Sequence, residues 1–471
     1  MTGWFRRLEQ ATRPVDTLTE AALQRRWAEL PDHVKTPSQT LGRCGVGCEG
    51  THGVFPKCNF ACKPCYHSRD ANHVRVNGAH TVAHVDKQMS YFHATRAPHA
   101  HAQLIGGEVS LLDADDHAEA LLVMRKYGRE PMSFTHGDFD YDYLKRIALG
   151  PDGRRRFERL SFAAHIDTTM VGRRGIRRTD NEADLDSYRR AFCDMFRRLR
   201  REHGVRFYLA HNMTVTPGNV DQIPGVVARC RAMGFNMFSF QPAAYVGDER
   251  RWSEDFRALD PDRVWNKIEE GTGARLPYRV FQVGDERCNR TAWGFLLGDQ
   301  WHPALDANDP ADMEVRDAYI RYFGGIHFNA PIHLLVPRLS RVVAAHPCLI
   351  PLAMRWLGRM IRRVGGPTAL IRHRIVPLAF VMHRFKHAAD VTPAWELLER
   401  GEMSDDPRIR ETQERLQACS YAMAHPESGR LVPACVQHSV LDPAENLQLS
   451  RELPIVRIRP RKETPTASSR I

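Results

Sequence analysis

The chain has 471 residues, 42% of them hydrophobic, and its 67 basic and 56 acidic side chains give a formal net charge of +11. A chain of this kind can bury a large core and is expected to hold one main domain with additions. The first residues lack a secretory apolar stretch, so no secretion signal is predicted, and no run is long and uncharged enough to span a bilayer. The eleven cysteines are therefore expected as metal ligands and buried thiols in the cytoplasm, not as disulfides.

The first half of the chain divides into a predicted helical extension over residues 1–43 and a core domain over residues 44–250. Cys44 and Cys48 open the core domain among glycines that permit tight wrapping about a metal. This pair is a candidate for a second cluster site or for two thiols on the substrate side.

Cys58, Cys62 and Cys65 follow with the spacing Cys-x3-Cys-x2-Cys. Three thiolates hold three irons of a [4Fe–4S] cluster, which leaves the fourth iron open to a small molecule. An ordinary electron carrier would supply a fourth cysteine. A zinc knuckle is the alternative, and it is disfavoured because no second Cys-x2-Cys pair lies nearby.

Short β-type runs alternate with helical stretches after the cysteines, which predicts parallel βα units. The expected fold is α/β, a partial (β/α)6 TIM-like barrel with helical N- and C-terminal additions, and a doubly wound sheet is the alternative. Strands are predicted over residues 51–57, 101–108, 132–137, 160–167, 205–215 and 235–243. Helices are predicted over residues 115–127, 140–148, 185–202 and 220–233, the last stopped by Gly234.

Gly106-Gly107-Glu108 ends the second predicted strand. The glycines let backbone approach a ligand closely, and the carboxylate can pair with a cationic amine. Polar residues at the other strand ends are candidates for binding the rest of such a ligand: Thr135, His136, Asp167, Asn212, Thr214 and Gln241.

The cysteine spacing, with Asn59 after the first cysteine, and the Gly-Gly-Glu run resemble the signatures of the radical S-adenosylmethionine (radical SAM) superfamily. One departure is Pro64, which stands where the family usually has an aromatic residue, with Tyr66 two positions later. The resemblance implies a [4Fe–4S] cluster on Cys58, Cys62 and Cys65, and S-adenosylmethionine bound near Glu108. It also implies cleavage to a 5′-deoxyadenosyl radical that abstracts hydrogen from substrate, and an electron donor of the flavodoxin or ferredoxin type.

Residues 251–410 are expected to be mostly helical and contain a basic amphipathic segment over residues 333–389. This segment has ten positive charges and no acidic residue. Leu352, Trp356 and Met360 recur at helical spacing, with arginines predicted on the opposite side, which is typical of a membrane-surface or anionic-ligand helix. The apolar run over residues 375–385 adds to the membrane interpretation. A nucleic-acid interface is disfavoured because aromatics are not interleaved with the charges.

Residues 411–455 form a candidate auxiliary metal-binding tail, and residues 456–471 are predicted to be disordered. Cys419 and Cys435 flank a glycine turn, which resembles the auxiliary-cluster tail of many radical SAM enzymes. Cys288 could complete a second iron–sulfur site with them and with the Cys44 and Cys48 pair. The remaining cysteines are expected in the core: Cys193, Cys230 and Cys348.

Two classes of function follow. The first is a radical SAM enzyme acting on a lipid or another membrane-associated substrate, with a peptide as the runner-up and transfer RNA third. The second is a non-enzymatic iron–sulfur or zinc protein in which the metal stabilises the fold or senses redox state. The Gly-Gly-Glu run favours the enzyme, because a structural cluster has no use for an amine site.

Overall fold

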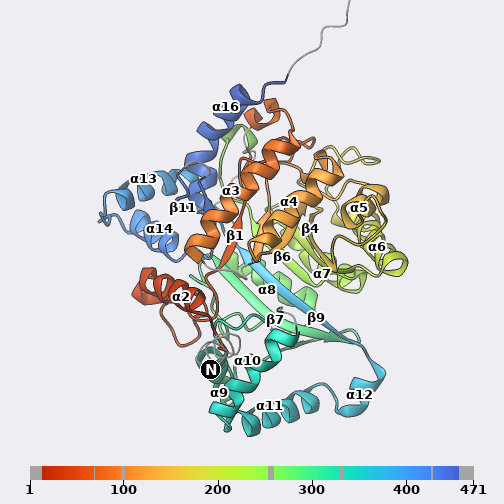
Figure 1. The fold of residues 1–471 in the computed structure, drawn as a ribbon, viewed down its shortest axis with the longest axis vertical. Helices are drawn as coiled ribbons and strands as arrows, with labels where there is room; N and C mark the ends of the chain where they lie inside the picture. Colours follow the sequence, from red (N-terminus) through yellow and green to blue (C-terminus); the bar gives the residue numbers. More distant parts are fainter. Residues whose placement is uncertain are drawn as a thin grey trace, which may run out of the picture.

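A computed structural model describes residues 13–67, 69–96, 101–252, 259–328, 330, 332–425 and 428–455. Within these ranges, one sheet of eleven strands forms the centre of the molecule, in the order β11-β10-β1-β2-β3-β4-β5-β6-β9-β7-β8 (Figure 1). Its strands are β1 (Cys48–Gly50), β2 (His101–Leu104), β3 (Glu130–Thr135), β4 (Arg159–His165), β5 (Arg206–Val215), β6 (Met237–Pro242), β7 (Asn289–Leu297), β8 (Gln300–Pro303), β9 (Ile375–His383), β10 (Tyr421–Ala424) and β11 (Leu431–Pro433).

Helices connect the strands and cover the sheet, and a helical insertion lies between β8 and β9. The helices of the first half are α2 (Thr17–Glu29), α3 (Gly78–Arg96), α4 (Ala114–Lys126), α5 (Tyr141–Ala148), α6 (Asp186–His203) and α7 (Ile223–Cys230). Those of the second half are α8 (Pro261–Thr272), α9 (Pro310–Phe323), α10 (Ile332–Ala345), α11 (Leu349–Arg363), α12 (Pro367–Arg372), α13 (Ala388–Glu399), α14 (Pro407–Gln417), α15 (Ala434–Val436) and α16 (Asp442–Glu452).

The strand order distinguishes the two folds that the sequence left open. Strands β1 to β6 lie side by side in chain order, each parallel to the one before. A doubly wound sheet would reverse direction at a switch point, so that alternative is wrong. The predicted α/β class is confirmed, but the parallel run is longer than six strands, because β10 joins β1 and β9 joins β6 in parallel.

Four predicted helices and five of the six predicted strands lie within a few residues of their expected positions. Asp113 and Asp140 cap the starts of α4 and α5 by accepting the amides of Asp115 and Tyr143. Gly234, with φ 104°, ends the helical stretch that contains α7, as predicted.

The first strand was predicted in the wrong place. The sheet strand is Cys48–Gly50, and the run over residues 51–57 leaves the sheet to pair with the segment after β2. Thr51 starts this departure, because its hydroxyl donates to the Ile105 carbonyl at 2.8 Å and so replaces a ladder bond.

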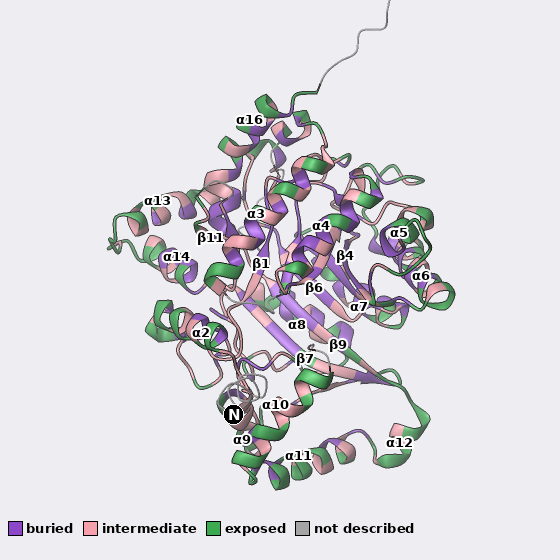
Figure 2. Cartoon of the chain, in the orientation of Figure 1, coloured by how far each residue is buried: buried purple, intermediate pink, exposed green. Residues whose placement is uncertain are grey.

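The apolar run after residue 374 is also not what the sequence suggested. It forms β9, a strand between β6 and β7 in which Leu378 and residues 380–382 are buried, so this part of the run gives no support to membrane contact (Figure 2). Ile375, at the start of the strand, is exposed. Phe380 stacks on Phe238 of β6 with ring centroids 5.6 Å apart. The range 251–410 thus adds β7, β8 and β9 to the sheet alongside its helices.

None of the helices in the described chain is both long enough and apolar enough to cross a membrane. The predicted disordered tail and the first twelve residues of the predicted N-terminal extension lie outside the described residues.

Candidate functional site

The thiols of Cys58, Cys62 and Cys65 lie on the loop that follows β1, at the edge of the sheet where the parallel strands end. The amides of Ala61 and Lys63 donate to carbonyl oxygens of the loop after β4, at 2.8 and 3.1 Å. The cysteine loop is therefore fixed across the strand ends and not free above them.

Gly106 and Gly107 hold the other side of this loop. The amide of Gly107 donates to the Phe55 carbonyl at 2.8 Å, and that of Glu108 donates to the Lys57 carbonyl at 2.9 Å. A Cβ on Gly107 would lie 2.2 Å from the Lys57 carbonyl oxygen, so only glycine permits this approach. The glycines thus serve the seating of the cysteine loop as well as any ligand.

Burial sets the charge state of the three thiols. It raises the pKa of Cys58 to about 12 and raises the pKa values of Cys62 and Cys65. Arg251 opposes this shift at Cys58 and Cys65, and the Phe60 amide donates to Cys58 Sγ at 3.4 Å. Buried thiols of this kind ionise when a metal cation replaces their protons, as cluster ligands do.

The three cysteine sulfurs are not gathered as a compact site for one ion. Among the described residues, the one set of three metal-ligating side chains whose ligand atoms all lie within 4.8 Å of one another contains no cysteine. A tetrahedral zinc with bonds of about 2.3 Å would hold its sulfurs about 3.8 Å apart. Cys58, Cys62 and Cys65 do not form such a compact set, so they are not gathered as ligands of a single zinc ion would be.

Glu108 is 1% exposed and accepts three hydrogen bonds. Its Oε1 accepts from the Ser110 amide at 3.0 Å and the Thr135 hydroxyl at 2.7 Å, and its Oε2 accepts from the His136 amide at 2.8 Å. All three donors are uncharged groups, so a cationic ligand amine could still pair with this carboxyl group.

His136 links this carboxylate to the cysteine loop. Its Nε2 lies 2.9 Å from Asn59 Oδ1, and its ring stacks on Phe60 with centroids 3.9 Å apart and planes 13° from parallel. Arg173 adds a guanidinium 5.5 Å from the Phe60 ring centroid and donates to the His136 carbonyl at 2.6 Å. These contacts leave the ends of β2 and β3 and the cysteine loop as one hydrogen-bonded unit.

Asp167, after β4, is buried within a network of its own. Its Oδ2 lies 2.6 Å from His165 Nε2, and it accepts the Thr169 hydroxyl at 2.6 Å and the Thr214 amide at 2.7 Å. Burial alone would raise its pKa, but His165 and these donors lower the pKa of Asp167 to about 2. This carboxylate is an ionised group whose negative charge also raises the pKa of Cys62.

Asn212 differs from its neighbours because its side chain has a free acceptor. It is 5% exposed on β5, and its Oδ1 has no hydrogen-bond partner among the described residues. Gln241 on β6, in contrast, donates to Ser239 at 2.7 Å. The buried Oδ1 of Asn212 is therefore a group that a ligand could satisfy.

Four of the five cysteines predicted for an auxiliary site influence one another electrostatically: Cys48, Cys288, Cys419 and Cys435. The pairing of β1 with β10 puts Cys48 opposite Tyr421, two residues after Cys419. Burial raises the pKa values of Cys48, Cys419 and Cys435, the last to about 12. Cys419 adds to the shift at Cys48, Cys288 adds to that at Cys419, and both add to that at Cys435. Arg415, 2% exposed, donates from Nε to Cys288 Sγ at 2.9 Å. These four thiols are the candidates for the predicted auxiliary site, and Arg415 places a buried cation beside one of them.

Cys44 does not join this set. It packs against α9, where its charge acts on Tyr319, and no described thiol affects its pKa, which burial raises to about 12. Cys193 and Cys230 are buried as predicted. Cys348 is exposed at the start of α11, so its prediction as a core residue is wrong.

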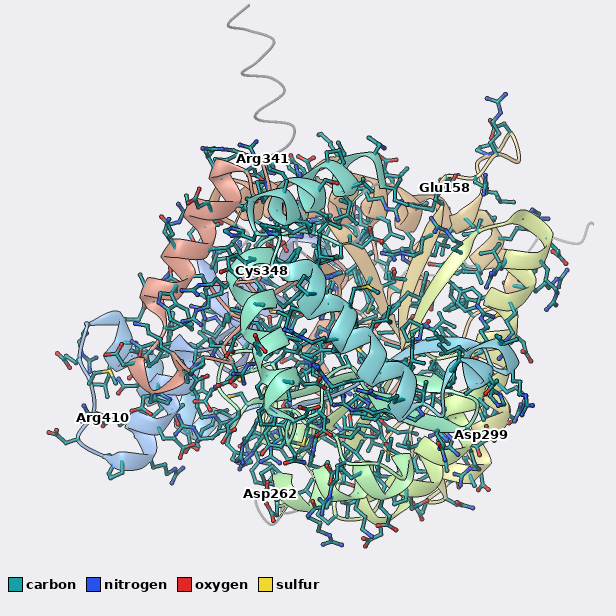
Figure 3. All side chains as sticks on the ribbon, turned by 90° about the horizontal axis from the view of Figure 1, so that it is seen from below. Glu158, Asp262, Asp299, Arg341, Cys348 and Arg410 are labelled. Atoms are coloured by element: carbon teal, nitrogen blue, oxygen red, sulfur yellow. The ribbon has the colours of Figure 1, made fainter. Side chains whose placement is uncertain are left out.

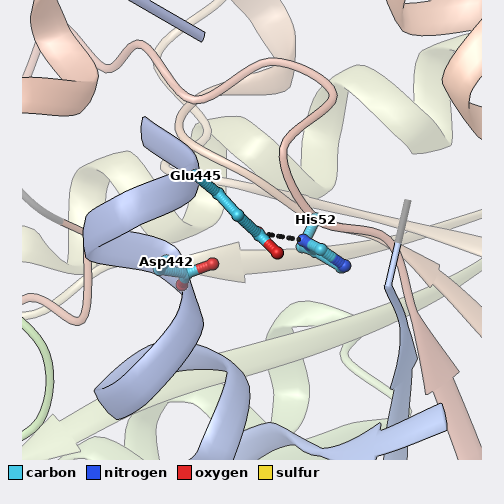
Figure 4. Close-up of side chains that lie close together, drawn as sticks. All are labelled: His52, Asp442 and Glu445. Atoms are coloured by element: carbon cyan, nitrogen blue, oxygen red, sulfur yellow. Dashed lines mark ion pairs between the residues drawn. The ribbon is translucent and has the colours of Figure 1, made fainter. Parts of the chain in front are cut away.

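His52, Asp442 and Glu445 are the compact set of ligand-type side chains mentioned above (Figure 4). His52 Nδ1 lies 3.0 Å from Glu445 Oε2, and His52 Nε2 lies 2.6 Å from the Ala424 carbonyl oxygen. Both neighbours are oxygen acceptors, an arrangement that favours the doubly protonated ring. Although burial opposes it, the pairing with Glu445 raises the pKa of His52, and the set is explained as a charged link between α16 and the loop after β1.

Sequence reasoning missed Arg251 and Arg173, which lie within loops and turns where no periodic pattern marks them. The sequence has Tyr66 two positions after Pro64, where the family usually has its aromatic residue. The ring of Tyr66 packs on His438 with centroids 4.2 Å apart. His438 in turn bonds Asp442 through Nδ1 at 2.7 Å, so the residue after the last cluster cysteine contacts the C-terminal segment.

No protein-family model matches the sequence, and no curated protein matches it. Similar solved structures include Streptococcus suis SuiB bound to S-adenosylmethionine, with 13% identity and TM-score 0.28, covering 41% of this chain and 40% of SuiB. Native anSMEcpe with bound AdoMet has 14% identity and TM-score 0.32, covering 47% of this chain and 58% of that protein. Coproporphyrinogen III oxidase (HemN) from Escherichia coli, a radical SAM enzyme, has 11% identity and TM-score 0.30, covering 48% of this chain and 51% of HemN.

The chain thus spans less than two thirds of each of these proteins, and the TM-scores are low. The assignment below rests on the residues of this chain.

Proposed function

We propose that this chain is a radical SAM enzyme in which Cys58, Cys62 and Cys65 hold a [4Fe–4S] cluster beside a site for S-adenosylmethionine. The observation that supports this most is the hydrogen-bonded junction between the cysteine loop and Gly107 and Glu108, which puts a buried carboxyl group beside the loop of the three thiols at the strand ends.

When bound, the cluster supplies the electron for reductive cleavage of S-adenosylmethionine. The residues of the chain bind, orient and exclude water. Glu108 accepts from the amine of the methionine end, and the free Oδ1 of Asn212 accepts from a hydroxyl or amine of the ligand. The stacked rings of Phe60 and His136 close the site on the side of the cysteine loop.

A second cluster on Cys48, Cys288, Cys419 and Cys435 is part of the proposal. Complete ligation suits it to electron transfer rather than to ligand binding at iron. Arg415, which donates to Cys288, offsets part of its negative charge. A protein of the flavodoxin or ferredoxin type is the proposed electron donor.

The test is anaerobic reconstitution with iron and sulfide, followed by dithionite, S-adenosylmethionine and an assay for 5′-deoxyadenosine. The wild-type chain is expected to bind about eight irons and to form deoxyadenosine, and the Cys58/Cys62/Cys65→Ala variant to keep about four irons and form none. Cys348→Ala is the matched control, because this exposed cysteine belongs to neither set.

Deoxyadenosine from the triple variant would overturn the assignment. Two clusters with no cleavage by the wild type would favour the non-enzymatic iron–sulfur protein. About four irons in both proteins would place the cluster on the second set of thiols and not on the first.

A further inference from the structure

The insertion between β8 and β9 exposes apolar side chains that nothing in the described chain covers. Eight of the fourteen exposed large hydrophobic residues of the described chain lie within residues 332–375, called here the arm, which comprises α10, α11, α12 and the start of β9. They are Ile332, Leu334, Val336, Ile350, Met354, Leu357, Ile371 and Ile375.

Helix α11 has one apolar face that packs on the protein and one that does not. On the packed face, Leu349, Leu352 and Met360 are buried, and Trp356 donates from Nε1 to the Ala304 carbonyl at 3.2 Å. The stripe Ile350, Met354 and Leu357 runs along a different side of the helix, at spacings of four and three residues, with exposures of 53%, 62% and 44%.

Two of the arginines do not lie where the sequence predicted. Arg359 and Arg363 are on the packed face of α11, where they pair with Asp309 and Asp312 at the start of α9. They fix α11 on the body of the protein, which leaves the apolar stripe turned outward as a rigid feature.

Exposed positive charges lie on α11 and in the segment after it. Arg355 and Arg362 of α11 are exposed, as are Arg372 and Arg374 after it, and none of the four pairs with a described residue. The sequence has no acidic residue between Asp317 and Asp390. Figure 3, seen from below, shows α11 along the surface nearest the viewer, with Cys348 labelled just before its start.

We infer that the arm docks on an anionic lipid bilayer, with α11 in the plane of the surface, its apolar stripe among the acyl chains and its arginines at the headgroups. Fifteen residues of helix extend about 22 Å, too short to span a bilayer but suited to lie along it. This inference is independent of the proposed radical chemistry.

Charge and composition favour this occupant over the others. A second copy docked through the same face would bring the free arginines of both copies together. Nucleic acid needs aromatic surfaces for stacking, whereas Trp356, the aromatic residue of α11, belongs to the packed face.

The experiment is co-flotation of the full chain, cluster-loaded, with vesicles of phosphatidylcholine alone or mixed with phosphatidylglycerol. Binding is expected to be at least about tenfold stronger with the anionic lipid and to weaken in high salt. The Ile350→Gln/Met354→Gln/Leu357→Gln variant should lose at least about tenfold in affinity for anionic vesicles. The Arg355/Arg362/Arg372/Arg374→Gln variant should lose the preference for anionic lipid.

Matched controls change the same residue types elsewhere on the surface. Met403→Gln/Leu447→Gln removes exposed apolar side chains, and Arg154/Arg177/Arg201/Arg410→Gln removes exposed arginines, and both should bind as the wild type does. Because the substituted side chains are exposed, the thermal unfolding midpoint should stay the same in all variants.

Three results would overturn the inference. They are equal binding to both vesicle types, loss of binding in the controls as well, and a concentration-dependent dimer in light scattering that the apolar variant abolishes. Deoxyadenosine formation without vesicles should be unchanged in the arm variants, so failure of docking and failure of the radical chemistry are distinguishable.

Discussion

The cysteine loop and the arm are the two most distinctive stretches of the sequence, and the structure treats them in opposite ways. The loop is tied by backbone hydrogen bonds to the segments after β2 and β4, and its neighbours Glu108 and Asp167 are each 1% exposed. The arm is joined to the body through one face of its helices and exposes the other. A site that must hold reacting atoms in fixed positions is made of buried residues that hydrogen-bond to one another. A surface that binds a fluid partner such as a bilayer can leave its apolar side chains exposed.

The difference between the cysteine loop and the arm is tested most directly by making the same substitution in both. Gly107→Ala would put a methyl group against the Lys57 carbonyl, so it should destabilise the protein by about 2–3 kcal/mol and abolish deoxyadenosine formation. Gly358→Ala, on α11, meets no atom within 4 Å and should stabilise the protein by about 0.5–1 kcal/mol. Urea unfolding measures both, and effects of the same sign would show that the two environments are not as different as described.

Loss of the carboxylate should affect ligand binding without removing the cluster. Glu108→Ala is expected to weaken S-adenosylmethionine binding by about 10-fold to 100-fold, because it removes the charge that the amine would meet. Calorimetric titration measures the affinity, and the iron content should equal that of the wild type. Glu119→Ala on the exposed side of α4 is the control. Unchanged affinity in the Glu108 variant would remove the amine site from this strand end.

Arg251 should affect the reduction potential of the cluster and not the binding of the ligand. It is 5% exposed, and its charge acts on Cys58 and Cys65. Arg251→Gln removes a buried cation that favours the more negative reduced cluster, so the reduction potential should fall by on the order of 50 mV. Potentiometric titration followed by electron paramagnetic resonance detects this, with the exposed Arg250→Gln as control. A potential that rises, or that does not move, contradicts this role.

The smallest expected effect concerns His52, which joins α16 to the core. Its folded pKa lies above 6.5, so its ion pair stabilises the protein fully below that pH and the contribution fades as pH rises through the folded pKa. His52→Gln should cost roughly 1 kcal/mol at acidic pH and less at alkaline pH, with no change in bound metal. Urea unfolding across this range, with metal analysis, is the measurement. A gap that widens with pH, or a metal lost from the variant, would point to a bound cation in place of the imidazolium.

The sequence predicted what periodicity and spacing encode. Helices α4 to α7 were found because apolar residues recur every three or four positions, and the strand ends that carry Glu108, Asp167 and Asn212 were found because β-type runs stop there. The first strand was misplaced because residues 51–57 have β composition but pair with a loop. The Thr51 hydroxyl bonds the Ile105 carbonyl, and Gly106 and Gly107 allow the loop to approach residues 55–57 closely.

Contacts between distant residues were beyond such patterns. The meeting of Cys48 with Cys419 depends on the pairing of β1 with β10, which no local pattern reveals. Cys44 is only four residues from Cys48 and has the same glycine-rich setting, yet it faces α9. On α11 the packed and the exposed apolar residues both have helical spacing, so the sequence pattern could not tell one row from the other. The ion pairs with Asp309 and Asp312 show which side of the helix packs on the protein.

The position of β1 between β2 and β10 has a consequence for how the protein is made. The segments that seat Cys58, Cys62 and Cys65 are nearly all within the first two fifths of the chain, whereas the other four thiols come from positions spread between residues 48 and 435. On a ribosome, the seat for the first set can assemble while translation continues, but the second set cannot close until almost the whole chain has emerged. The edge of β1 that awaits β10 stays unpaired throughout that interval, which makes it the place where a nascent chain would most need protection.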